Sequence, residues 1–173
     1  MIRRHHSTKR WIACQLQFRG RRRSQLMAPG RYTELFFLDE ATALAAGHRP
    51  CAECRRADYD RLTSLWADRH PDQSGADAID AQLHAERLAG PDGQRRLHEA
   101  GYRGLPDGAF ALRDGRPHLV LGSRLLAWSP GGYTGAAARP ARGQATVITP
   151  PALVALLAEG YTPLVPLLHP SVT

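Results

Sequence analysis

Residues 36–56 hold the pattern that most constrains this chain: an apolar segment, a short helix, a glycine and a Cys-x-x-Cys pair. Asp39 is a good N-cap for a helix over residues 40–46, and Gly47 is placed to end it. Cys51 and Cys54 follow at once, behind the rigid turn that Pro50 favours. Two thiolates at this spacing can ligate one tetrahedral Zn²⁺. The pattern therefore predicts a zinc knuckle behind a capped helix.

The amino-acid sequence and spacing of this segment are specific: FFLDEATALAAGHRPCAECRR. It resembles the metal-binding domain of the Ada DNA-repair proteins, in which an aromatic strand and an "EALAAG" helix precede an "RPCxxC" knuckle. The resemblance covers residues 36–56 only. It implies that Cys51 and Cys54 are zinc ligands and that the partner is nucleic acid, with DNA expected rather than RNA.

The second half of the family's zinc site is missing from this chain. The family supplies a Cys-x-x-x-Cys pair upstream, whereas the residue four positions after Cys14 is Phe18 and the residue four positions before it is Arg10. Cys14 is therefore the one remaining thiol that can serve as third ligand, and a small buried side chain on a strand is the alternative for it. Since the pair is broken, we do not extend the family's methyl transfer from DNA phosphotriesters to this protein. The fourth ligand is either His5, His6 or His48, or the site has no histidine ligand. The alternative for His48 is a ring that lies on the domain surface and binds no metal.

Three cysteines in 173 residues do not form a disulfide framework, and an odd number points to metal or thiol chemistry. A thioredoxin-like redox pair is the main rival to zinc for Cys51 and Cys54. Such a pair opens a helix after a central strand, whereas here a predicted helix precedes the knuckle. Unligated structural thiols are the third alternative.

Positive charge is concentrated at the start of the chain. The formal net charge is +7, yet residues 1–33 hold nine of the 23 basic residues and none of the 16 acidic ones. A local excess of this size repels itself unless an anionic partner neutralises it, so nucleic acid is a candidate partner and a merely solvated arm is the equal alternative. The phosphate-contacting candidates are Arg3, Arg4, Lys9, Arg10, Arg19, Arg21, Arg22 and Arg23.

A second polar group lies on the predicted helix over residues 76–89. Asp80 and His84 are four residues apart and share a helix face with Asp77, while Glu86 points elsewhere. Carboxylates beside a histidine suit a divalent metal or a general base, so Asp80, His84 and Glu86 are weak candidates for a nuclease site. A solvated face with ordinary ion pairs is the alternative. Further along the chain, His98, Arg95 and Arg96 are possible additions.

Two aromatic residues flank a turn in the second half of the chain. Trp128 and Tyr133 can stack on a nucleic-acid base, or they can simply pack in the core and against the turn. Ser129 between them lacks the motif of a serine nucleophile.

Apolar periodicity and turn residues predict an α+β fold in two parts. Residues 1–100 form a zinc-knuckle unit with a basic arm, and residues 101–173 form a mostly antiparallel β unit that can share its core. In the first unit we expect strands over 9–18, with Trp11, Leu16 and Phe18 near the core, and over 31–38. Helices follow over 57–68 and 76–89, and then a helical or irregular segment over 94–100. In the second unit we expect strands over 109–113, 116–121, 123–129 and 144–149, a loop over 130–143 and a helix over 152–158.

Neither a membrane span nor a secretory signal is evident, because no apolar run approaches the roughly 20 residues that a membrane helix needs. The expected location is cytoplasmic. The first functional hypothesis is a zinc protein that acts on nucleic acid, in DNA repair or processing. The alternatives are a metal-dependent nuclease and a structural or adaptor protein with a zinc staple, so enzymatic activity is left open.

Overall fold

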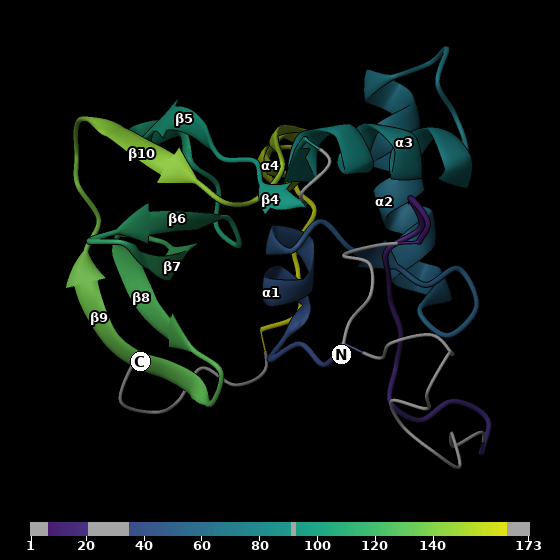
Figure 1. Cartoon of the computed structure of the whole chain (residues 1–173), viewed down its shortest axis with the longest axis horizontal. Helices are drawn as coiled ribbons and strands as arrows, with labels where there is room; N and C mark the ends of the chain where they lie inside the picture. Colours follow the sequence, from purple (N-terminus) through teal and green to yellow (C-terminus); the bar gives the residue numbers. More distant parts are fainter. Residues whose placement is uncertain (1–6, 21–34, 91–92, 166–173) are drawn as a thin grey trace.

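The computed structural model describes residues 7–20, 35–90 and 93–165 and has the predicted α+β class of fold. Figure 1 shows the strands of the main sheet on one side of the molecule and helices α2 and α3 on the other, with α1 and α4 between them. The helices are α1 (Glu40–Ala45), α2 (Arg56–Arg69), α3 (Ala76–Arg87) and α4 (Pro151–Ala158), with a short 3-10 turn at Tyr102–Gly104. No helix of the described residues is long and apolar enough to cross a membrane.

The main sheet has six antiparallel strands in the order β5-β10-β6-β7-β8-β9. The predicted hairpin turn at Asp114 and Gly115 joins β6 to β7, and both residues have positive φ, as a two-residue hairpin turn requires. The strands are β5 (His98–Gly101), β6 (Phe110–Arg113), β7 (Arg116–Leu121), β8 (Arg124–Ser129), β9 (Gly132–Ala138) and β10 (Gln144–Val147).

Two segments differ from the sequence-based prediction. The predicted loop over residues 130–143 contains strand β9. Its sequence, GYTGAAA, lacks the alternation of apolar and polar residues by which a strand is predicted. The backbone pairing with β8 is what defines this edge strand. The segment 94–100, predicted as helical or irregular, contains β4 (Gln94–Arg95) and the start of β5. Leu88 leaves the helix and pairs with Arg95 in the small ladder of β4 with β3 (Leu88–Ala89).

The N-terminal segment forms much less sheet than predicted. Of residues 9–18, β1 (Ile12–Ala13) pairs in parallel with β2 (Arg49–Pro50), and Phe18 forms an isolated β-bridge. Leu16, expected near the core, is 76% exposed, because the short β2 leaves it no partner strand. The predicted strand over 31–38 begins outside the described residues, and its described part, 35–38, has no strand structure.

The helices that surround the knuckle follow the predicted pattern. Asp39 caps α1 by accepting a hydrogen bond from the backbone N–H of Thr42, and Gly47 follows the helix with φ +78°. On α2, Leu62 and Trp66 are buried on one face, as the spacing predicts. The knuckle therefore lies between α1, whose start is fixed locally by Asp39, and α2, whose buried face follows from the spacing of its apolar residues.

One large cluster of buried side chains draws on both predicted units. Leu44 of α1, Trp66 of α2 and Leu83 of α3 belong to the same cluster as Val120 of the sheet and Leu156 of α4. A second cluster packs α1 against the sheet through Ala41, Ala45, Phe110, Leu119, Leu126 and Tyr133. Helix α1, which leads into the knuckle, thus contributes to both clusters.

Candidate metal centre

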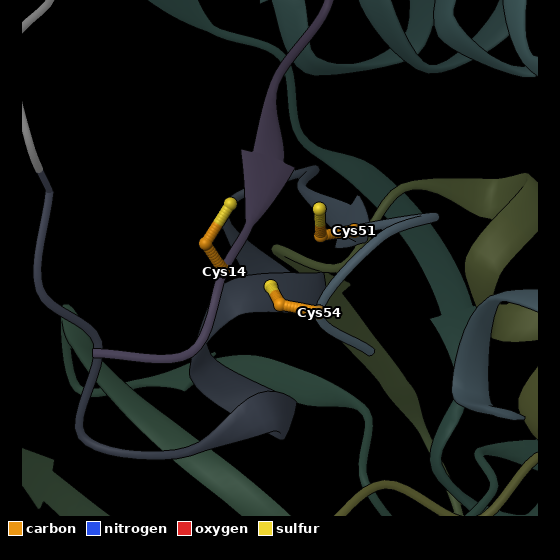
Figure 2. Close-up of side chains that lie close together, drawn as sticks. All are labelled: Cys14, Cys51 and Cys54. Atoms are coloured by element: carbon orange, nitrogen blue, oxygen red, sulfur yellow. The ribbon is translucent and has the colours of Figure 1, made fainter. Parts of the chain in front are cut away.

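The three cysteines of the chain lie together. The Sγ atoms of Cys14, Cys51 and Cys54 are all within 4.8 Å of one another, so Cys14 lies beside the two thiols of the knuckle. Figure 2 shows the Cys14 side chain reaching from the N-terminal segment toward the two knuckle thiols. A tetrahedral zinc with bonds of ~2.3 Å separates its sulfurs by roughly 3.8 Å. Small side-chain adjustments would therefore allow the three sulfurs to bind one ion.

Parallel pairing of two very short strands brings the thiols together. The backbone N–H of Arg49 donates to the carbonyl of Trp11, and that of Cys51 donates to the carbonyl of Ala13, each at 3.1 Å. Ala13 is paired with Pro50, so the next residue on each strand is a cysteine. The register of β1 on β2 therefore decides that Cys14 meets Cys51.

Two buried ion pairs hold the ends of the knuckle. Before the thiols, Arg49 makes a two-pronged contact with Asp80 of α3 at 2.9 and 2.8 Å, and these side chains are only 5% and 3% exposed. After the thiols, Arg55 pairs with Glu40 of α1 at 2.8 Å. Charge-assisted pairs of this geometry orient both partners. These two pairs thus position Cys51 and Cys54 from both sides of the knuckle.

The thiols perturb one another's ionisation. The Cys14 side chain is exposed as a whole, but partial desolvation of its sulfur, together with the neighbouring Cys51 and Cys54, raises the pKa of Cys14 to about 12. Burial alone would raise the pKa of Cys51, but the N–H groups of Cys54 and Glu53 outweigh it, so that this pKa is lowered. The pKa of Cys54 is raised by burial, although its sulfur accepts a hydrogen bond from the N–H of Gln15 at 3.2 Å. A bound metal cation would favour the ionised form of all three thiols.

Cys14 is exposed, so the alternative of a small buried side chain is wrong. His48 is the opposite case, because it is 4% exposed and the expected surface ring is wrong as well. Its ring contacts those of Trp11 and Phe37, at centroid distances of 5.1 and 4.6 Å. Among the described residues no histidine or carboxylate joins the thiol cluster, and His5 and His6 lie outside the described part of the chain.

The polar residues of α3 have separate partners. Asp80 is 2% exposed and engaged by Arg49, so it belongs to no solvated face. Asp77 pairs with Arg10 at the surface, and Nδ1 of His84 lies 3.2 Å from Arg87. Glu86 accepts hydrogen bonds from Gln82 and from the backbone N–H of Ala152 at the start of α4. Within residues 7–20, 35–90 and 93–165, the thiols are the one group of His, Cys, Asp or Glu with metal-binding geometry.

The additional candidates on β4 and β5 also serve the fold. Arg95 donates to the carbonyls of Ala45 and Ala46 at the end of α1, and to that of Ile148. Arg96 donates to the carbonyl of Leu88, and His98 lies 2.9 Å from the carbonyl of Thr149. These three residues therefore do not join Asp80 and His84.

The basic candidates divide between described and undescribed segments. Lys9, Arg10 and Arg19 are exposed, and Arg10 also forms the surface pair with Asp77. The other five, Arg3, Arg4, Arg21, Arg22 and Arg23, lie outside the described residues. The three described side chains are on the same segment as Cys14, within five residues of it on either side.

The aromatic pair of the β unit is part of the packing. Tyr133 is 4% exposed and donates a hydrogen bond to the carboxylate of Asp39, the N-cap of α1. Tyr133 belongs to the buried cluster between α1 and the sheet, and Trp128 packs against that cluster. The two residues are paired across β8 and β9. Because the ring of Tyr133 is buried, a nucleic-acid base cannot stack on it. Tyr133 therefore packs in the core, which was the alternative to base stacking.

Arg87, and Arg49 and Arg55 on either side of the knuckle, were not among the predicted site residues. A signal for Arg87 was present, because residues 79, 83 and 87 are spaced by four on α3 and share the face of Ile79 and Leu83. Arg49 and Arg55 flank the knuckle directly, but only the tertiary structure supplies Asp80 and Glu40 as their partners.

Comparison of the chain with family models, with curated proteins and with solved structures finds no match in any of the three.

Proposed function

We propose that this protein is a zinc-thiolate protein that acts on nucleic acid, with Cys14, Cys51 and Cys54 holding the ion and the basic N-terminal segment contacting phosphate. The observation that carries the proposal is the convergence of three thiols, one of them exposed, on a knuckle that the fold already positions. Thiolates favour zinc and other soft ions over calcium or magnesium. A third thiol beside the pair favours a metal over a two-cysteine redox centre.

The partner is inferred from charge. Cys14 lies on the segment that carries the exposed Lys9, Arg10 and Arg19, and three consecutive arginines follow at positions 21–23. A metal bound to Cys14 and the knuckle would hold this segment at one place on the fold. Contacts of arginine with phosphate are independent of sequence and are weakened by salt.

The resemblance to the Ada metal-binding domain supports DNA repair or processing as the setting. It bears on Cys51 and Cys54 and on the α1 segment that precedes them. A three-cysteine site differs from that family's site, so the proposal ends at zinc and nucleic-acid binding and includes no alkyl transfer.

The metal is tested on protein purified without chelator. We expect about one zinc per chain by elemental analysis, and a loss of zinc in Cys14→Ser, Cys51→Ser and Cys54→Ser. His98→Ala is the control, since His98 lies on β5 of the main sheet and contacts the carbonyl of Thr149, and it should keep its zinc. Folded parent protein that contains no metal would contradict the proposal, and full affinity in Cys14→Ser would reduce the site to a pair.

Nucleic-acid binding is tested by titrating single- and double-stranded DNA and RNA over a range of salt concentrations. We expect the affinity to fall steeply with salt. Replacing Arg21, Arg22 and Arg23 together by Ala should lower the slope for duplex DNA by up to about 3, roughly 0.9 for each phosphate that the variant no longer neutralises. The matched control replaces Arg103, Arg116 and Arg142, which are exposed outside the basic segment.

The outcomes of this titration separate the alternatives. A flat salt response, or a triple variant that binds like the parent, would leave the protein as an adaptor with a metal staple. Strand cleavage with Mg²⁺ or Mn²⁺ that disappears in His84→Ala would support the nuclease.

A further inference from the structure

Arg87, the last residue of α3, is completely buried. Among the described residues its guanidinium hydrogen-bonds two backbone carbonyls and contacts a histidine, but it pairs with no carboxylate. A buried charge is costly unless its surroundings satisfy it. Its placement therefore calls for a role beyond filling the core.

The guanidinium connects the two segments that carry the thiols. Nη1 donates to the carbonyl of Gly47 at 2.9 Å, and Nη2 donates to the carbonyl of Lys9 at 2.8 Å. The ring of Trp11 stacks on the same group, with its centroid 3.9 Å from Cζ. Gly47 is four residues before Cys51, whereas Lys9 and Trp11 lie five and three residues before Cys14.

The other described contacts of the Cys14 segment are short or lie at the surface. The ladder of β1 with β2 comprises two residue pairs, the N–H of Gln15 donates to Sγ of Cys54 at 3.2 Å, and the ring of Trp11 contacts that of His48. Arg10 also pairs with Asp77 of α3, where both side chains are exposed. Leu16, just beyond Cys14, is exposed. Arg87 adds a buried contact to these, because its one side chain holds both the carbonyl of Lys9 and the ring of Trp11.

We propose that Arg87 is a positioning residue of the metal centre, which holds the Cys14 segment against the knuckle so that three thiolates rather than two reach the ion. The inference rests on the proposed zinc site and assigns to it a residue that contacts neither the metal nor a thiol. Burial lowers the pKa of Arg87 only to about 10, so the side chain stays charged at neutral pH. The charge strengthens both carbonyl hydrogen bonds and the stacking on Trp11.

Arg95 is the matched control. Like Arg87 it is largely buried and donates to carbonyls at the end of α1, those of Ala45 and Ala46. Its hydrogen bonds to described residues include none to the segment 7–20. Replacing either arginine removes a charge from the same helix end, but only Arg87 links that end to Cys14.

The experiment compares Arg87→Met, Arg87→Lys and Arg95→Met with the parent and with Cys14→Ser. Zinc affinity is measured by competition with a chromophoric chelator, and the number of thiolate ligands by the sulfur-to-metal charge-transfer band of the Co²⁺ form. We expect Arg87→Met to bind zinc ten- to a hundredfold more weakly, the usual effect of losing a group that orients a ligand. Its Co²⁺ band should fall toward that of Cys14→Ser, Arg87→Lys should be intermediate, and Arg95→Met should match the parent.

A second measurement uses metal-free protein. The amides of Arg49 and Cys51 donate to the Cys14 segment, so their hydrogen exchange reports its docking directly. We expect faster exchange of these two amides in Arg87→Met and in Trp11→Leu. Trp11→Leu leaves α3 and Arg87 intact, so it still tests the inference if Arg87→Met does not fold. The inference would be overturned if these variants matched the parent in zinc affinity, cobalt spectrum and hydrogen exchange. It would also be overturned if Arg95→Met lost as much as Arg87→Met. The proposed zinc site would stand in both cases. A parent that binds no metal would instead refute the proposed function itself.

Discussion

His48 illustrates how a single residue can lie beside a metal centre without belonging to it. It precedes Cys51 by three residues, but its ring is buried between Trp11 and Phe37, and its Nδ1 atom has no hydrogen-bond partner among the described residues. Burial, followed by the positive charge of Arg87, lowers the pKa of His48 from 6.5 to about 4. The folded protein therefore holds this ring in its neutral form.

The pH dependence of stability follows from this pKa. Between pH 6.5 and about 4 the unfolded chain binds a proton at His48 that the folded chain does not, so stability is full above this window and falls as the pH drops through it. The loss is at most roughly 3 kcal/mol. We expect urea midpoints of metal-free protein at pH 7 and pH 4.5 to differ less in His48→Phe than in the parent. Equal acid sensitivity of the two would contradict this assignment.

At the scale of the element, the end of α1 decides how the chain enters the knuckle. Gly47 has φ +78°, and a Cβ atom there would lie 2.7 Å from Cδ of Arg87. The carbonyls of Ala45, Ala46 and Gly47 accept hydrogen bonds from Arg95 and Arg87, which neutralises the negative end of the helix. The glycine thus allows both the left-handed turn and the close approach of Arg87.

Gly47→Ala separates these two requirements when it is compared with Gly115→Ala. Gly115 has a similar φ of +71°, but a Cβ atom there would meet nothing within 4 Å. Both variants should lose roughly 1–2 kcal/mol for the left-handed backbone. We expect a clearly larger loss for Gly47→Ala, because Arg87 must also move, together with weaker zinc binding. The measurements are chemical unfolding and the chelator competition, and equal losses would show that the close approach of Arg87 is unimportant.

At the scale of the whole molecule, the chain is built around one principal core. The large buried cluster takes side chains from α1, α2, α3, the sheet and α4. Glu40 adds a polar connection, since it pairs with Arg55 beside the knuckle and accepts hydrogen bonds from the hydroxyl of Tyr161 and the backbone N–H of Leu164. The knuckle side and the β side therefore depend on the same interior.

Unfolding should accordingly be a single transition. We expect denaturation curves from far-ultraviolet circular dichroism and from tryptophan fluorescence to coincide, as they do for one cooperative unit. Excess zinc should shift both curves together, because an ion that binds only the folded state stabilises that whole state. Two separate transitions, or a zinc effect on one probe alone, would show that residues 1–100 and 101–173 fold independently.

The sequence by itself determined the features that depend on near neighbours. The cap at Asp39, the stop at Gly47, the Cys-x-x-Cys spacing and the hairpin turn at Asp114 each follow from a few consecutive residues, and the structure has them. The α+β class also follows, because the period of apolar residues differs between helix and strand. Cys14 was predicted as third ligand from the number of thiols alone.

Only the tertiary structure decided what each polar residue faces. Asp80 and His84 have the spacing of a catalytic pair, yet Arg49 lies 31 residues earlier in the chain than Asp80 and engages it in the interior. Arg87 shares the α3 face of Ile79 and Leu83, but only the tertiary structure supplies the carbonyls of Lys9 and Gly47 as its partners. Strand β9 likewise exists because β8 pairs with it. Local patterns encode turns, caps and periods, whereas burial and ionic partners depend on contacts between segments that are distant in the chain.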